Sequence, residues 1–188
     1  EGRLGDVRGV TGVFSYDNAD ASNIRNRVEY GGGGLYDIGC YLVNSVRWVF
    51  GGEPRDVSAA IVRDPATGVD VLTSFVLTFD GGHAVGQCGT QHAPHQRVTI
   101  YGSRARLEIA VPFNVPHDAP ARLWLDDARS PTGTGAETVT VAPSDQFGLM
   151  GAAFSDAVLA GGPAPYPLED SRANAAVIER VFAAARHN

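Results

Sequence analysis

The strongest constraint on the fold is an alternation of apolar and polar residues across the middle of the chain. Within residues 69–79 the apolar side chains fall on one face of an extended strand, at Val69, Val71, Phe75, Leu77 and Phe79. Asp80-Gly81-Gly82 then predicts a hairpin turn. Related patterns predict strands at residues 7–16, 57–63, 83–91, 96–101, 104–111, 122–125 and 137–141. The chain is therefore expected to form a mainly antiparallel sheet.

Three other segments have helical spacing. In residues 35–50 the apolar residues recur three or four apart, at Ile38, Leu42, Val46 and Val49, and Gly51-Gly52 with Pro54 ends the pattern. Two helices close the chain, one carrying Phe147, Met150, Phe154 and Val158, the other starting near residue 169. One helix before the strands and two after them predict an α+β fold, an open, mainly antiparallel β-sheet with helices on one face.

The second face of this sheet is not plainly polar. Leu72, Val76, Tyr101 and Trp124 lie on the pleat opposite the strongest apolar stripe of their strands. An exposed apolar sheet face usually marks a partner surface. We therefore expect a homo-oligomer that packs through this face.

Composition narrows the class of protein. The 188 residues, 44% of them hydrophobic, predict one domain with a substantial core. The net charge of −6 argues against nucleic acid and anionic membranes as partners. Two cysteines do not make a disulfide framework, so a cytoplasmic location is expected. All 15 basic residues are arginine, so chemistry that needs an ammonium group must obtain it from elsewhere.

The run Gly31–Gly34 raises the question of a dinucleotide site. The G-x-G-x-x-G fingerprint follows a strand and is completed by a third glycine. Here the position of that third glycine is Asp37, whose carboxylate would repel a pyrophosphate, and residues 24–30 do not read as a strand. A run without side chains is still compatible with a flat ligand lying against the backbone.

Asp37 and Tyr41 are the sharper signal. Residues four apart share a helical face, and Asn44 and Arg47 extend the same polar edge. A tyrosine can exchange a proton with a substrate hydroxyl, and a carboxylate one turn away can orient that network. The spacing alone is also typical of an aspartate that stabilises the helix N-terminus beside a half-buried tyrosine.

The histidines offer a competing site. Cys88, His92 and His95 are close in sequence and are of the types that bind zinc. No fourth ligand has motif spacing, and Ala93-Pro94 interrupts regular geometry, so no metal is expected. His92 is instead predicted to line a ligand pocket.

The segment NIRNRVEYGGGGLYDIGCYLVN resembles the opening of the second domain of the glucose-fructose oxidoreductase/inositol dehydrogenase (Gfo/Idh/MocA) family. The family pattern of an arginine, a glycine cluster and D-x-G-x-[Tyr or His] falls on Arg25, Gly31–Gly34, Asp37, Gly39 and Tyr41. The resemblance continues through RVTIYGSRARLEIAVPFNVP and the closing PLEDSRANAAVIERVFAAA. Val28 stands where a proline is common, and the fourth glycine lengthens the cluster.

This resemblance implies the C-terminal substrate-binding and oligomerisation domain of an oxidoreductase, spanning residues 1–188, without the family's N-terminal Rossmann domain. That domain would bind NAD or NADP and supply a catalytic lysine, so the isolated chain is expected to be inactive. Tyr41 would be the acid/base and Asp37 would assist it. Gly32 and Gly33 would lie near the nicotinamide.

Tyrosine at position 41 resembles the branch that acts on aldoses and trans-dihydrodiols. Arg25 and Asn44 are predicted substrate contacts because of their position on the side of Tyr41. The alternative is a non-catalytic ligand-binding or oligomerisation module with the same fold. The presence of Arg25, Asp37 and Tyr41 favours the oxidoreductase.

Overall fold

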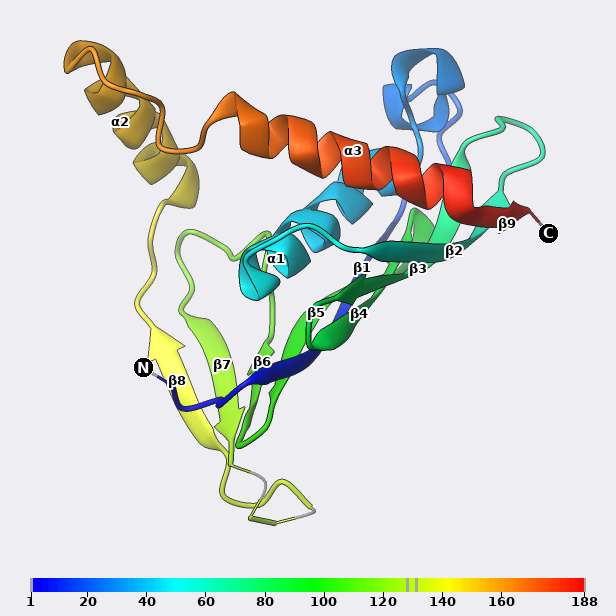
Figure 1. Cartoon of the computed structure of the whole chain (residues 1–188). Helices are drawn as coiled ribbons and strands as arrows, with labels where there is room; N and C mark the ends of the chain where they lie inside the picture. The colour runs from blue at the N-terminus through cyan, green and yellow to red at the C-terminus, as the bar shows by residue number, and fades with distance from the viewer. Residues whose placement is uncertain (1, 128, 131, 188) are drawn as a thin grey trace.

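The computed structural model describes residues 2–127, 129–130 and 132–187, and its centre is one twisted sheet (Figure 1). The nine strands of these residues lie in the order β8-β7-β6-β5-β1-β4-β3-β2-β9. Their bounds are β1 Val7–Asp17, β2 Asp56–Arg63, β3 Asp70–Phe79, β4 Gly82–Gly89, β5 Gln91–Gly102, β6 Arg106–Ile109, β7 Ala121–Asp126, β8 Glu137–Val141 and β9 Ala185–His187. The predicted α+β fold with a mainly antiparallel sheet is confirmed.

Strand β1 occupies the middle of the sheet although it comes first in the chain. It pairs in parallel with β4, where Val10 lies beside Ala84, and antiparallel with β5, where Val10 lies beside Ile100. The β2–β9 pair is also parallel, and the remaining neighbours are antiparallel. The strand that leads into the candidate site is therefore fixed from both sides.

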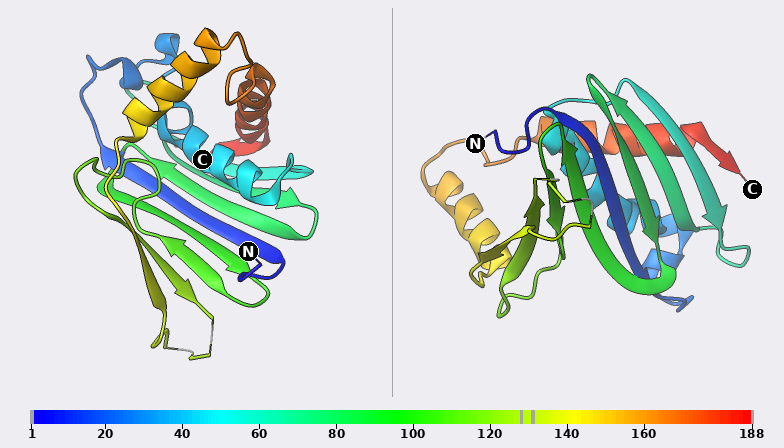
Figure 2. Two further views of the ribbon diagram at one scale, coloured as in Figure 1. Left: turned by 90° about the vertical axis from the view of Figure 1, so that its left-hand side faces the viewer. Right: turned by 90° about the horizontal axis from the view of Figure 1, so that it is seen from below.

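Helices cover one face of the sheet (Figures 1 and 2). Helix α1 (Cys40–Phe50) and helix α3 (Leu168–Ala184) pack on each other and on the strands. The predicted stripe of α1 enters the core: Leu42 and Val46 are almost fully buried, together with Val177 and Val181 of α3. The opposing core residues of the sheet include Val10, Phe14, Phe75, Leu77, Val98 and Ile100.

The other face of the sheet carries no helix (Figure 2). Val76, Val85 and Tyr101 are 39–47% exposed on it. Apolar side chains therefore stand on this face within the described part of the chain, as the alternation indicated, and the homo-oligomer remains a prediction.

Helix α2 (Gln146–Leu159) stands apart from the core (Figure 1). The apolar residues that the sequence places on it, Phe147, Met150, Phe154 and Val158, are 58–68% exposed. Its spacing therefore predicts the helix correctly but not a buried face. Neither α2 nor any other helix of the described residues has the length and apolar character of a membrane-spanning helix.

A buried arginine joins α1 to α3. The Arg47 guanidinium is 6% exposed and lies 2.7 Å from Glu53 Oε1 and 3.0 Å from Asp170 Oδ1. Its Nη1 also donates to Asn174 Oδ1 at 3.5 Å. The hydrogen bond to Glu53 is the main reason why the pKa of Arg47 is raised, so its charge is permanent.

We expect Arg47→Met to lower the free energy of unfolding by about 2–3 kcal/mol, since it leaves two carboxylates without their shared cation. Urea denaturation measures the loss. Arg172→Met on the exposed side of α3 is the control and should change stability by less than about 0.5 kcal/mol. Equal losses in the two variants would contradict the proposed link between the helices.

Candidate active site

The glycine run is shaped by a buried carboxylate. Gly33 has φ 119°, and a Cβ there would lie 2.0 Å from Asp70 Oδ1. Asp70 is 1% exposed, and its Oδ2 accepts hydrogen bonds from Leu35 N at 2.7 Å and Thr73 Oγ1 at 2.9 Å. Burial raises the pKa of Asp70, and these hydrogen bonds oppose the rise. The glycines thus let the backbone pass over Asp70.

The N–H groups of Gly31, Gly32 and Gly33 all donate hydrogen bonds to backbone carbonyls within the chain. Gly33 N donates to Arg25 O at 2.8 Å, and Gly32 N donates to Arg27 O at 3.0 Å. A phosphate cradle needs such groups directed at the ligand. Gly32 and Gly33 therefore do not form one, and their predicted nearness to the nicotinamide stays a prediction.

The predicted helix from residue 35 begins with a π-helical turn, Leu35–Gly39, and is α-helical only from Cys40. Its first N–H is taken by Asp70, and Gly39 lies against Leu35 and Cys88 where a Cβ would have no room. π turns are frequent at functional sites. Asp37 lies in this turn and Tyr41 in the following α-helical one, so the expectation of one regular helix was wrong here.

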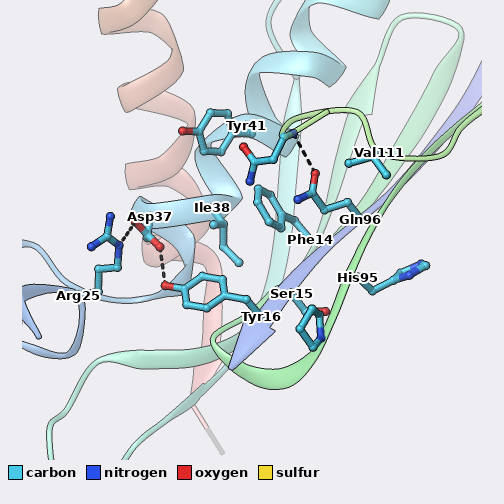
Figure 3. Close-up of a pocket in the computed structure, with 12 residues that line it drawn as sticks. Phe14, Ser15, Tyr16, Arg25, Asp37, Ile38, Tyr41, His95, Gln96 and Val111 are labelled. Carbon is cyan, nitrogen blue, oxygen red and sulfur yellow. Dashed lines mark hydrogen bonds and ion pairs between the residues drawn. The ribbon is translucent and has the colours of Figure 1, made fainter. Parts of the chain in front are cut away.

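Asp37 and Tyr41 nevertheless line the same cavity, of about 440 Å³ (Figure 3). The cavity lies between the end of β1, the start of the helix, the 3₁₀ turn Ile24–Asn26, β5 and the segment after β6. Its lining residues are Phe14, Ser15, Tyr16, Arg25, Asp37, Ile38, Tyr41, Pro94, His95, Gln96, Val111 and Asn114.

Both carboxylate oxygens of Asp37 are engaged (Figure 3). Arg25 Nε donates to Oδ1 at 2.9 Å, and the Tyr16 hydroxyl donates to Oδ2 at 2.5 Å. Burial and this hydrogen bond raise the pKa of Tyr16, while the positive charge of Arg25 opposes the rise. Tyr16 is therefore protonated at neutral pH and acts as a donor.

Tyr41 is in a different environment. Its side chain is 48% exposed, and its ring lies 6.0 Å from that of Phe14 and 5.6 Å from that of Phe113, centroid to centroid. Its hydroxyl makes no hydrogen bond to other described residues. The aromatic contacts hold the ring while the hydroxyl stays available to a ligand.

The segment that carries Phe113 is fixed by Gln96. The Oε1 atom of Gln96 accepts hydrogen bonds from the backbone N–H groups of Phe113 and Asn114, both at 3.3 Å. Phe113 in turn stacks on Phe14 with 5.3 Å between centroids. One wall of the cavity is thus aromatic and its rim is polar, which is the usual composition of a small-molecule site.

Three predicted site residues, Arg25, Asp37 and Tyr41, line one cavity. The other two predicted substrate contacts, Asn44 and His92, do not line it. His92 is exposed and lies over Gly89; it does not line the cavity, and His95 does. The β1–β5 register shifts between the pairs Ser15–His95 and Asp17–Gln91, and His92 falls within this irregularity.

Asn44 lies elsewhere too. Three residues after Tyr41, it is rotated by about 60° around the helix towards α3. It lines a second hollow with Arg47, and its Nδ2 lies 3.5 Å from Asp170 Oδ2. Asn44 thus does not line the cavity that contains Tyr41, and its role as a substrate contact stays a prediction.

Tyr16 and Gln96 also line the cavity, although neither was predicted as a site residue. Both follow the alternation of buried neighbours, since Tyr16 continues the Val10 and Phe14 face and Gln96 precedes Val98 and Ile100 on theirs. The signal in the sequence was a polar residue at the next alternate position beyond a run of core-facing apolar residues.

The structure groups no three His, Cys, Asp or Glu side chains that could hold a metal ion among the residues it describes. Cys88 is fully buried, and that burial raises the pKa of its thiol well above the ordinary value. It packs in the core under the helix start rather than beside His92 or His95 in a ligand cluster.

Comparison with known proteins identifies the family. The family model for the GFO/IDH/MocA C-terminal domain matches residues 1–108. The chain belongs to the GFO/IDH/MocA family. This GFO/IDH/MocA chain is 40% identical over 181 residues to an uncharacterized oxidoreductase of Rhizobium meliloti, covering 96% of the chain and 54% of that relative.

Two further relatives of the GFO/IDH/MocA chain have described activities. A D-xylose 1-dehydrogenase (NADP(+)) of Haloferax volcanii is 31% identical, with 97% of the chain and 55% of the relative covered. The crystal structure of a 3-ketoreductase from Actinomadura kijaniata, in complex with NADP and TDP-benzene, matches with a TM-score of 0.86 and 27% identity over 99% of the chain and 56% of that protein. The chain spans about half the length of the relatives it matches.

Proposed function

We propose that the chain forms the substrate site of an NAD(P)-dependent oxidoreductase, which transfers a hydride between nicotinamide and a hydroxyl-bearing carbon of a sugar (aldose) or a diol. The observation that carries the proposal is one cavity lined by both Asp37 and the half-exposed Tyr41. The D-xylose dehydrogenase and the trans-1,2-dihydrobenzene-1,2-diol dehydrogenases among the relatives support the substrate class.

In this proposal Tyr41 donates or accepts the proton at the reacting oxygen of the substrate. Tyr41 donates its phenol proton to a carbonyl oxygen when the substrate is reduced. In the oxidative direction it accepts the proton of the substrate hydroxyl after passing its own to the surroundings. Asp37 is the negative charge that orients a substrate hydroxyl beside it.

The walls of the cavity fit a small polyol. The rings of Phe14 and Tyr41, inclined at 47° to each other, give an apolar surface for the carbon skeleton, while His95, Gln96 and Asn114 offer polar groups to hydroxyls. Arg25 Nε is engaged by Asp37, so the rest of its guanidinium is the part that faces a ligand.

The cofactor would supply or accept the hydride. The N–H groups of Gly32 and Gly33 donate to backbone carbonyls, so the glycine run does not fit the pyrophosphate of a dinucleotide. We therefore assign no phosphate contact to it, and propose that NAD or NADP is held mainly by another domain. The 188-residue chain alone is expected to give no turnover.

The test uses the product of the full gene. NAD- and NADP-linked oxidation of a panel of aldoses and trans-diols, followed by nicotinamide absorbance, should show turnover of at least one compound. Isothermal titration of the same panel gives binding separately. Binding without turnover with either nucleotide would overturn the proposal and favour the non-catalytic module.

We also propose that the open sheet face is the interface of a homo-oligomer. Val85→Glu places a charge among the exposed apolar residues of this face and should shift the protein to monomers in light scattering, because burying an unpaired charge is costly. Val158→Glu on α2, away from the sheet, is the control and should keep the oligomer. A wild-type protein that is monomeric at micromolar concentration would contradict the prediction.

A further inference from the structure

Two tyrosines line the cavity, Tyr16 and Tyr41, and only the hydroxyl of Tyr16 is hydrogen-bonded to another described residue. The Tyr16 hydroxyl gives its proton to a 2.5 Å hydrogen bond with Asp37 Oδ2, whereas Tyr41 has no such bond among the described residues and is 48% exposed. A phenol already committed to a carboxylate is a poor proton donor to a substrate. Tyr41 is therefore the tyrosine that can transfer a proton to a substrate, and Tyr16 has a different role.

The role of Tyr16 follows from its hydrogen bond to Asp37. The Asp37 side chain is 23% exposed, and its two oxygens are each bonded to a different element of the fold. Arg25 reaches Oδ1 from a 3₁₀ turn whose own start is capped by Asn23, and Tyr16 reaches Oδ2 from the end of β1. With both oxygens fixed, the carboxylate plane has one orientation relative to the cavity.

Strand β1 is suited to this role. It is paired on both edges up to Ser15, with Gly89 of β4 and His95 of β5. Phe14, two residues before Tyr16, is 3% exposed and supports the ring of Tyr41. One rigid strand therefore sets the positions of both the carboxylate and the phenol ring of Tyr41.

We propose that Tyr16 is a positioning residue of this active site, which holds Asp37 by its hydroxyl so that the carboxylate faces the substrate beside Tyr41. The role rests on the proposed function. Arg25 shares it, since its Nε bonds the other oxygen. A charge-assisted hydrogen bond of this length is strong and directional, so a single hydroxyl suffices for the effect.

The first test needs no turnover. In the 188-residue chain labelled with ¹³Cζ-tyrosine, the Tyr16 resonance is assigned by its loss in Tyr16→Phe and followed as the pH is raised. It should keep its protonated position after the exposed tyrosines have ionised. In Asp37→Asn the pKa of Tyr16 should fall, because the carboxylate that raises it is gone. Arg25, Tyr41 and His95 are the other ionisable groups at the cavity.

The second test is a double-mutant cycle in the full-length oxidoreductase. Tyr16→Phe should lower kcat by about 10- to 100-fold, the effect of losing a hydrogen bond to a charged group, with little change in the KM for the nucleotide. Combined with Asp37→Asn, it should add almost nothing, since Tyr16 acts only through Asp37. The melting temperature reports any structural loss separately.

Tyr30→Phe is the matched control. It removes a phenol hydroxyl from a tyrosine that is 62% exposed and does not line the cavity, and should leave kcat unchanged. Any one of three results would overturn this role. These are additive losses in the cycle, an unchanged kcat in Tyr16→Phe, and a Tyr16 pKa that is the same in Asp37→Asn as in the wild type. If the full-length protein turns over no substrate, the proposed function fails and the catalytic role with it. The titration then still decides whether Tyr16 holds Asp37.

Discussion

Replacing Tyr41 with phenylalanine is expected to lower kcat/KM of the full-length oxidoreductase by about 10²- to 10⁴-fold, the usual contribution of a positioned acid/base. The free energy of unfolding should change by less than about 0.5 kcal/mol. The ring would keep its contacts with Phe14 and Phe113, and its hydroxyl makes no hydrogen bond to other described residues. The variant thus removes a proton without disturbing the wall of the cavity.

Steady-state kinetics with NADP and the best substrate of the wild-type protein measures this effect. Tyr30→Phe is a suitable control because Tyr30 is 62% exposed and does not line the cavity. Substrate affinity, measured by titration, should be nearly the same in Tyr41→Phe as in the wild type. A variant that retains more than about a tenth of the wild-type kcat would remove Tyr41 from the role of acid/base.

The largest effect on stability is expected from Gly33→Ala, a loss of about 3 kcal/mol or more. A residue with a side chain rarely adopts φ 119°, and its Cβ would meet Asp70 Oδ1 at 2.0 Å. Asp70 has little freedom to withdraw, because its other oxygen is bonded to Leu35 N and Thr73 Oγ1. The start of the helix that carries Asp37 should therefore shift along with the glycine run.

Denaturant unfolding of the 188-residue chain gives the measurement, and Gly31→Ala is the matched control. Gly31 also has a positive φ, 70°, but nothing lies within 4 Å of the position of its Cβ. It should lose only the cost of the left-handed conformation, about 1 kcal/mol. Similar losses in the two alanine variants would show that the contact with Asp70 is unimportant.

Alternation and helical spacing predicted the central sheet and its helices because burial on one face leaves a repeating pattern in the sequence. The prediction failed where the decisive contact is distant. The π-helical turn at Leu35–Gly39 depends on Asp70, which is 35 residues away from Leu35 and has no local signature. The prediction for helix α2 failed in another way. Its apolar residues predict a helix, but they stay exposed in the structure.

The candidate site shows the same difference between residues that are close in the sequence and contacts that are distant in it. Arg25, Asp37 and Tyr41 lie in one short segment, so a family resemblance carried by that segment located all three, and the structure brings them to one cavity. Tyr16 and Gln96 reach the cavity from two strands that are far apart in the chain. Their places depend on the pairing of β1 with β5, which spacing along one segment does not encode.

The central place of β1 constrains how the protein folds. Val10 acquires its neighbours Ala84 and Ile100 only after β4 and β5 have been synthesised. Closing such long loops before their contacts stabilise the chain slows folding. The nascent strand must stay unpaired on the ribosome until its two partners emerge. Since Tyr16 lies at the end of this strand and His95 and Gln96 lie on β5, the cavity assembles only once β1 has paired with β5, and a chain released before β5 would have no partial site.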